Sequence, residues 1–134
     1  MEATDLMNGD WVINANIPKQ VLGVVGHKAL FLEGKTKMWL PLHACYPIPL
    51  TQEIFEKNGF ERNEFGGYEI IIYDGDVLEI NVEEIPICNK LFFHIRYSCL
   101  GVTYQRHCID MQIDFVHELQ QALRLLGIEK EIVL

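Results

Sequence analysis

The sequence predicts an α+β domain, in which a small curved, barrel-like β unit (residues 1–49) precedes a mostly antiparallel sheet with two helices (residues 50–134). Three patterns indicate this fold: short apolar runs between glycines in the first forty residues, β-branched, aromatic or alternating runs over residues 67–97, and helical apolar spacing near the C-terminus. The chain has 134 residues, of which 49% are hydrophobic and 22% charged, as is ordinary for one folded domain.

The first unit is predicted from its glycines and prolines. Short apolar segments at 11–13, 21–25, 29–32 and 37–40 are separated by turn residues, and Pro18 is expected to end the first of them. Short strands joined by glycine turns favour a strongly curved sheet or small barrel. Three further prolines between residues 41 and 49 exclude a regular helix or a central strand there.

A short helix is expected over residues 50–60. Thr51 is a good N-cap, and Leu50 and Phe55 have the spacing of a hydrophobic staple. Gly59 follows Asn58 and should end the helix, after which Phe60 can pack back on Phe55.

Residues 67–73, 76–82 and 91–97 are predicted to be strands of one sheet, with residues 100–106 as a further candidate strand. Asp74-Gly75 is a strong hairpin signal. The strand that follows it alternates apolar and polar residues, which is typical of a half-buried sheet.

The closing helix is expected to run from Asp114 as its cap to Gly127. Its apolar stripe has helical spacing and consists of Val116, Leu119, Leu123 and Leu126. Ile128 can then close a contact on Leu123. On a helical wheel, His117, Gln121 and Arg124 lie away from this stripe, on a face expected to be solvated.

Charge is unevenly distributed along the chain, whose formal net charge is −8. Residues 51–84 hold ten acids and two bases, whereas residues 85–109 hold three bases and no acid. The overall negative charge disfavours long nucleic acids as partners. No apolar run approaches the roughly 18–20 residues that a membrane span needs, and the acidic start is unlike a signal peptide, so we expect a cytoplasmic protein.

Catalytic and metal-binding motifs are incomplete. The segment His117-Glu-Leu-Gln-Gln121 lacks the second histidine of a zinc protease motif. Cys99, His107, Cys108 and the nearby His94 have ligand chemistry but not the spacing of a closed zinc site. Without a secretion signal, reduced thiols are expected for the cysteines, which are Cys45, Cys88, Cys99 and Cys108. We therefore expect neither cofactor nor metal; the alternative is a small hydrolytic or metal-dependent enzyme using His94, His107 or His117.

The basic and aromatic stretch over residues 94–107 is the candidate ligand-binding site. Guanidinium groups bind phosphate or carboxylate in a bidentate manner, and tyrosine rings can stack on a planar ligand. The predicted site consists of Arg96, Tyr97, Tyr104, Arg106 and His107. This chemistry suits a small anionic, nucleotide-like molecule. The alternative is that Arg96 and Arg106 pair with acids of residues 51–84 across the sheet.

Three segments together carry a family resemblance: "DLMNGDWV", "IPLTQEIFEKNGFERN" and "DFVHELQQALRLLGIEKEI". They resemble a family of small uncharacterised proteins of Bacteroidetes phages, prophages and mobile elements, with an L-x-x-G-D start, a P-L-T-x-E helix ending in N-G-F and a V-H-x-L-Q closing helix. The segments cover about a third of the chain and are in the family's order. The resemblance implies an accessory protein acting in the bacterial host cytoplasm, and it implies no activity.

The expected function is therefore binding rather than catalysis. We expect a non-catalytic accessory protein that binds a host factor or sequesters a small anionic host molecule, as an anti-defence protein would. A protein–protein interaction module is a further alternative. The apolar excess in a short chain also predicts a homo-oligomer, with a shared surface drawn from Trp11, Trp39, Phe92 and Phe93.

Overall fold

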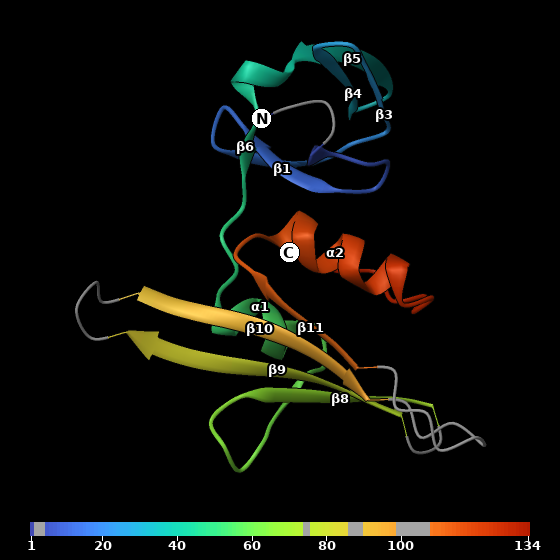
Figure 1. Cartoon of the computed structure of the whole chain (residues 1–134). Helices are drawn as coiled ribbons and strands as arrows, with labels where there is room; N and C mark the ends of the chain where they lie inside the picture. The colour runs from blue at the N-terminus through green and yellow to red at the C-terminus, as the bar shows by residue number, and fades with distance from the viewer. Residues whose placement is uncertain (2–4, 74–75, 86–89, 99–107) are drawn as a thin grey trace. The chain divides into compact units, whose positions relative to one another are not determined.

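The structure is a computed structural model that describes residues 1, 5–73, 76–85, 90–98 and 108–134 (Figure 1). It confirms the α+β class, with mostly antiparallel sheets and helices. The chain divides into two compact units. Unit 1 consists of Met1–Pro49, Phe115–Ile132 and Leu134, and unit 2 consists of Leu50–Asp114 and Val133. The sequence grouped the closing helix with residues 50–134, whereas in the structure that helix belongs to unit 1.

The described strands of unit 1 form two antiparallel sheets rather than a closed barrel. One sheet has the order β2-β1-β6 and the other the order β3-β4-β5. Their bounds are β1 (Trp11–Asn14), β2 (Ile17–Gln20), β3 (Gly23–Val25), β4 (Lys28–Glu33), β5 (Thr36–Pro41) and β6 (Tyr46–Pro47). The barrel-like closure expected from the sequence is therefore wrong for the described residues.

Strand β2 was missed in the sequence because it contains Pro18. Ala15 and Asn16 adopt positive φ values of 50° and 62°, which makes a tight turn from β1 into β2. Pro18 then lies opposite Ile13 on a strand at the sheet edge, where a missing amide hydrogen is tolerated. The prolines after residue 40 exclude a regular helix and a central strand, as expected: Pro41 is the last residue of the edge strand β5, Pro47 lies in the edge strand β6, and between these strands is only a 3-10 helix, η2 (Leu42–Ala44).

Helix α2 (Val116–Leu125) completes unit 1. Val116, Leu119 and Leu123 are buried, as the apolar stripe predicted. Its expected cap is wrong, because Phe115 occupies the N-cap position and Asp114 instead accepts a hydrogen bond from Gln112. At the other end the expected contact is confirmed: Gly127 N donates to Arg124 O and Ile128 N to Leu123 O, which is a Schellman motif. Neither described helix has the length and apolar character needed to cross a membrane.

Unit 2 is built on an antiparallel sheet of order β11-β10-β9-β8-β7. Its strands are β7 (Glu61–Arg62), β8 (Tyr68–Tyr73), β9 (Asp76–Ile85), β10 (Lys90–Ser98) and β11 (Cys108–Ile113). Tyr73 pairs with Asp76, which confirms the predicted hairpin. The candidate strand over residues 100–106 lies outside the described residues, and β11 was not predicted.

An aromatic cluster forms the core of unit 2. Helix α1 (Gln52–Lys57) is capped by Thr51, whose Oγ1 accepts from Ile54 N, as expected. Phe55 is fully buried and its ring lies 5.2–5.5 Å from those of Phe60, Tyr68 and Phe93. Phe93 is only 3% exposed, so its expected place on a surface shared between subunits is wrong.

Candidate functional site

The predicted ligand site falls largely outside the described structure. Tyr104, Arg106 and His107 lie outside the described residues, and for Arg96 and Tyr97 the structure describes the backbone of β10 alone. Arg96 is opposite Glu79 of β9 and Asp110 of β11.

Arg96 and Tyr97 occupy opposite faces of their strand. Tyr97 is opposite Leu78, which is fully buried, whereas Arg96 is opposite Glu79, on the other face. Adjacent positions on a strand cannot face one ligand from the same side. The register also places Arg96 opposite Glu79, an acid of residues 51–84, which is the position that cross-strand charge pairing would require.

His117 is buried, so the expected solvated face of α2 is wrong. It is 5% exposed, its ring stacks on that of Phe115 with centroids 5.8 Å apart, and its Nδ1 has no hydrogen-bond partner among the described residues. Burial lowers the pKa of His117 below its ordinary value, against the opposing effect of Glu118, Asp10 and Asp5. The imidazole is therefore neutral at neutral pH.

The polar residues of α2 bind the first turn of the chain. Gln120 Oε1 accepts from Trp11 N at 2.9 Å, and Gln120 Nε2 donates to Gly9 O at 2.9 Å. The fully buried Asp10 carboxylate accepts from Gln121 Nε2 at 2.7 Å and from Arg124 Nη1 at 2.6 Å. These side chains hold the fold together and leave no free acid–base pair for catalysis among them.

Metal and thiol chemistry are not supported by the described residues. Among them, no three His, Cys, Asp or Glu side chains are grouped as metal ligands would be. Cys45 is buried and its thiol lies 3.6 Å from the carbonyl oxygen of Pro41. Burial raises the pKa of the Cys45 thiol, which opposes formation of a reactive thiolate.

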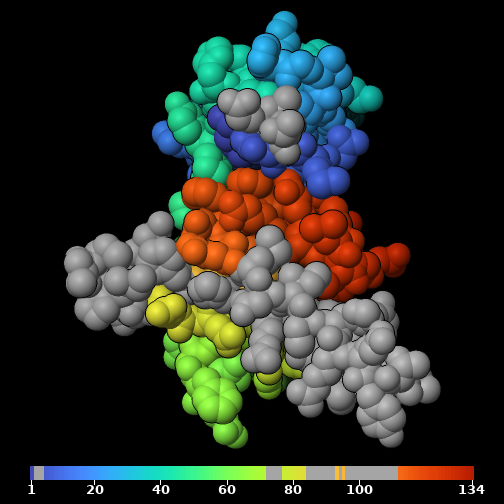
Figure 2. Space-filling model, viewed as in Figure 1, coloured from blue at the N-terminus to red at the C-terminus, as the bar shows by residue number. Residues whose placement is uncertain are grey.

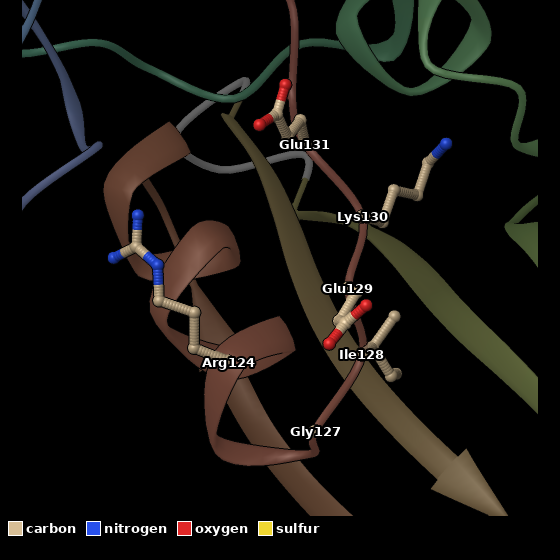
Figure 3. A pocket seen from close by; sticks show the side chains of 6 residues that line it. All are labelled: Arg124, Gly127, Ile128, Glu129, Lys130 and Glu131. Carbon is tan, nitrogen blue, oxygen red and sulfur yellow. The ribbon is translucent and has the colours of Figure 1, made fainter.

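A surface cavity of about 690 Å³ lies beside the C-terminal end of α2. Its lining is charged and consists of Arg124, Gly127, Ile128, Glu129, Lys130 and Glu131. Figure 3 shows the Arg124 and Lys130 side chains pointing in different directions, and Arg124 is already paired with Asp10. A site for a small anion would require these cations to converge on one point, and they do not.

The outer face of the β3-β4-β5 sheet is a stronger candidate. Because Ala29 and Phe31 point into the core, the alternate positions of β4 and their partners on β3 and β5 face outward. These positions define what we call the Trp39 face: Val25, Lys28, Leu30, Leu32, Lys37 and Trp39. Val25, Leu32 and Trp39 are 68%, 54% and 46% exposed. Figure 2 shows the blue-to-teal residues of these strands at the molecular surface.

Lysines lie among the apolar side chains of this face. Lys28 is opposite Val25, and Lys37 is opposite Leu32. Residues 19–37 hold four lysines and a single acid, Glu33, which pairs with Lys19 at 2.7 Å. The sequence contains this basic segment, but it does not stand out in a net charge, because residues 1–50 hold four lysines and four acids.

Comparison with protein-family models, curated proteins and solved structures gave no match to this chain.

Proposed function

We propose that this chain is a non-catalytic binding protein that docks an acidic, apolar segment of a host protein on its Trp39 face. The supporting observation is the exposure of Val25, Leu32 and Trp39 beside Lys28 and Lys37 on one sheet face. As an accessory protein of a phage or mobile element, it would act in the bacterial host cytoplasm by occupying that host factor.

The chemistry of the face favours this partner. A contiguous exposed apolar surface with a charged rim is typical of a protein-binding site. Trp39 offers a large ring as an anchor, while the lysines attract carboxylates and accelerate association. Exclusion of water from the apolar side chains then supplies most of the affinity.

Nucleic acid is a weaker candidate for the same face. Single-stranded nucleic acid is bound by several stacking aromatics within a strongly basic groove. Here the apolar neighbours of Trp39 are aliphatic, and the protein as a whole carries a net charge of −8. Its overall field would repel a polyanion.

The test uses Trp39 as its own reporter. In a Trp11→Phe background, Trp39 is the remaining tryptophan, and its emission is followed during titration with a short peptide of alternating glutamate and leucine. We expect a blue shift that weakens with added salt, because docking removes the ring from water while carboxylates approach lysines. A peptide of alternating lysine and leucine should bind at least about tenfold more weakly.

A matched pair of variants locates the site. Lys28→Glu/Lys37→Glu should lose the titration, whereas Lys57→Glu/Lys130→Glu, which alters net charge by the same amount at two lysines that are not part of the Trp39 face, should keep it. Equal loss in both variants would show that net charge alone drives binding and would refute the proposal.

A small anionic, nucleotide-like ligand is the competing occupant. A thermal-shift screen of nucleotides, repeated with Arg96→Ala and Arg106→Ala, addresses it, because a ligand raises apparent stability by mass action. Stabilisation lost in both variants would favour the basic stretch over the Trp39 face.

A further inference from the structure

The outer face of the unit 2 sheet carries a row of acids. The register places Glu61 opposite Glu69 and Glu69 opposite Glu79, so three carboxylates occupy adjacent strands on one face. Beside this row, Ile71 is 74% exposed and is opposite Val77, while Phe65 is 89% exposed. We call Glu61, Phe65, Glu69, Ile71, Val77 and Glu79 the acidic face.

The acidic face is also hollowed. A cavity of about 380 Å³ is lined by residues of β7, β8, β9 and the β7–β8 turn: Arg62, Asn63, Glu64, Phe65, Glu69 and Glu79. It therefore combines an exposed aromatic ring, a concave surface and two carboxylates of the row. This combination suits an apolar side chain flanked by cations.

The row costs stability in the isolated molecule. Like charges directly opposite each other on adjacent strands are destabilising. In the described register Glu79 is also opposite Arg96 of β10, so the repulsion is centred on Glu69, which has a glutamate opposite it on both sides. A partner that brings a cation to Glu69 would relieve the repulsion and cover Ile71 at the same time.

We infer that the acidic face of one molecule docks on the Trp39 face of a second copy. The two faces are complementary in kind: each is the open side of an antiparallel sheet with exposed apolar side chains, one bearing lysines and the other glutamates. Lys28 and Lys37 of one copy would meet Glu69 and Glu79 of the next, while Trp39 and Val25 cover Ile71 and Phe65.

This inference rests on the proposed function because it fills the same Trp39 face. A second copy and an acidic host segment then compete for that face, so self-association regulates how much of it is free. The contact joins two different surfaces, and such a heterologous interface leaves one surface of each kind open at the ends of an assembly. Assembly therefore grows with concentration and declines with salt.

Two charge-reversal variants test the inference. Variant K is Lys28→Glu/Lys37→Glu, and variant E is Glu69→Lys/Glu79→Lys. In either variant alone, like charges meet at the contact, so each should be monomeric. The monomer mass of the parent chain is 15.5 kDa. Mixed together, the intact acidic face of variant K meets the intact Trp39 face of variant E. The two reversed faces also carry opposite charges, glutamates on variant K and lysines on variant E. The mixture should therefore assemble by alternation of the two variants, as the parent does, whereas neither variant should assemble alone.

The measurement is sedimentation velocity at low salt, with circular dichroism as a check on folding. Should variant E fail to fold, Glu69→Gln/Glu79→Gln replaces it and should weaken assembly of the parent sequence at least about tenfold. A parent that stays monomeric at every concentration overturns the inference. So does a mixture of folded variants that stays monomeric, or a variant that assembles alone as well as the parent does.

The same variants separate this inference from the proposed function. Variant E keeps its Trp39 face, so the glutamate–leucine peptide should bind it at least as well as it binds the parent. If variant E binds the peptide but the mixture does not assemble, only the self-association is wrong. If the mixture assembles but variant E does not bind the peptide, the host-segment proposal is wrong.

Discussion

Arg124 Nη1 lies 2.6 Å from Oδ1 of Asp10, whose carboxylate is completely buried. Asp10 lies in the turn before β1, and Arg124 lies in the last turn of α2. Their ion pair therefore attaches α2 to the first turn of unit 1. Both side chains have a structural role, so their polarity does not by itself indicate an activity.

Removal of the Arg124 charge should destabilise the protein. Arg124→Met leaves the buried Asp10 carboxylate with its bonds from Met7 N and Gln121 but without its cation, which should cost about 2–3 kcal/mol of unfolding free energy. Urea unfolding measures the loss. Lys130→Met is the control and should change stability by less than about 0.5 kcal/mol. Equal effects would mean that the ion pair contributes nothing.

Gln120→Leu should lower the free energy of unfolding substantially. The substitution leaves the amide of Trp11 and one bond of the Gly9 carbonyl unsatisfied in a buried place, at about 2–4 kcal/mol. Gln20 is the matched control, because its exposed amide also donates to Gly9 O, at 2.9 Å, and water can replace it. Thermal unfolding of Gln120→Leu and Gln20→Leu compares them, and a similar shift in both would contradict the role of burial.

Stability should fall as the solution is acidified, in part through His117. The pKa of this group is lowered in the folded state from its ordinary value of 6.5, so the unfolded chain binds the proton more readily. The contribution of the neutral His117 side chain to stability is therefore complete above about pH 6.5 and is lost as the pH falls below that value. His117→Gln should flatten this part of the profile, whereas His43→Gln, at an exposed position, should not. The test is to measure the unfolding midpoints of the parent and of both variants from about pH 7.5 to about pH 5, a range that covers the titration.

Gly67→Ala should be strongly destabilising. A Cβ atom at Gly67 would overlap the carbonyl oxygen of Ile80 on the neighbouring strand, so the backbone of β9 would have to move. Gly23→Ala is the control, since a Cβ there meets only Asn8 Oδ1 at 4.0 Å and should change stability by less than about 1 kcal/mol. Comparable midpoints for the two alanine variants would show that the close approach at Gly67 relaxes easily.

Local signals in the sequence predicted much of the fold. The Thr51 cap, the Phe55–Phe60 contact and the Gly127 helix end each depend on a few neighbouring residues, and the structure confirms all three. Strand β2 was missed because Pro18 is tolerated only at an edge, and edges are decided by the whole sheet.

The site was less predictable because it depends on distant parts of the chain. A helical wheel places His117 away from the apolar stripe, yet residues such as Asp5 and Asp10 cover this side of α2 from more than a hundred positions earlier. The Trp39 face likewise appears only when the register of β4 and β5 aligns Lys28, Leu30 and Trp39 on one surface.

The division of unit 1 into two distant segments affects how the protein is made. When a ribosome has released Met1–Pro49, the side of unit 1 that later receives α2 still lacks Val116, Leu119 and Leu123, which are synthesised after all but one residue of unit 2. The long intervening stretch raises the entropy cost of closing that contact. Unit 1 can therefore be completed only after residues 115–132 have been translated, and a nascent chain stalled before residue 115 would hold an unfinished core that chaperones or proteases can recognise.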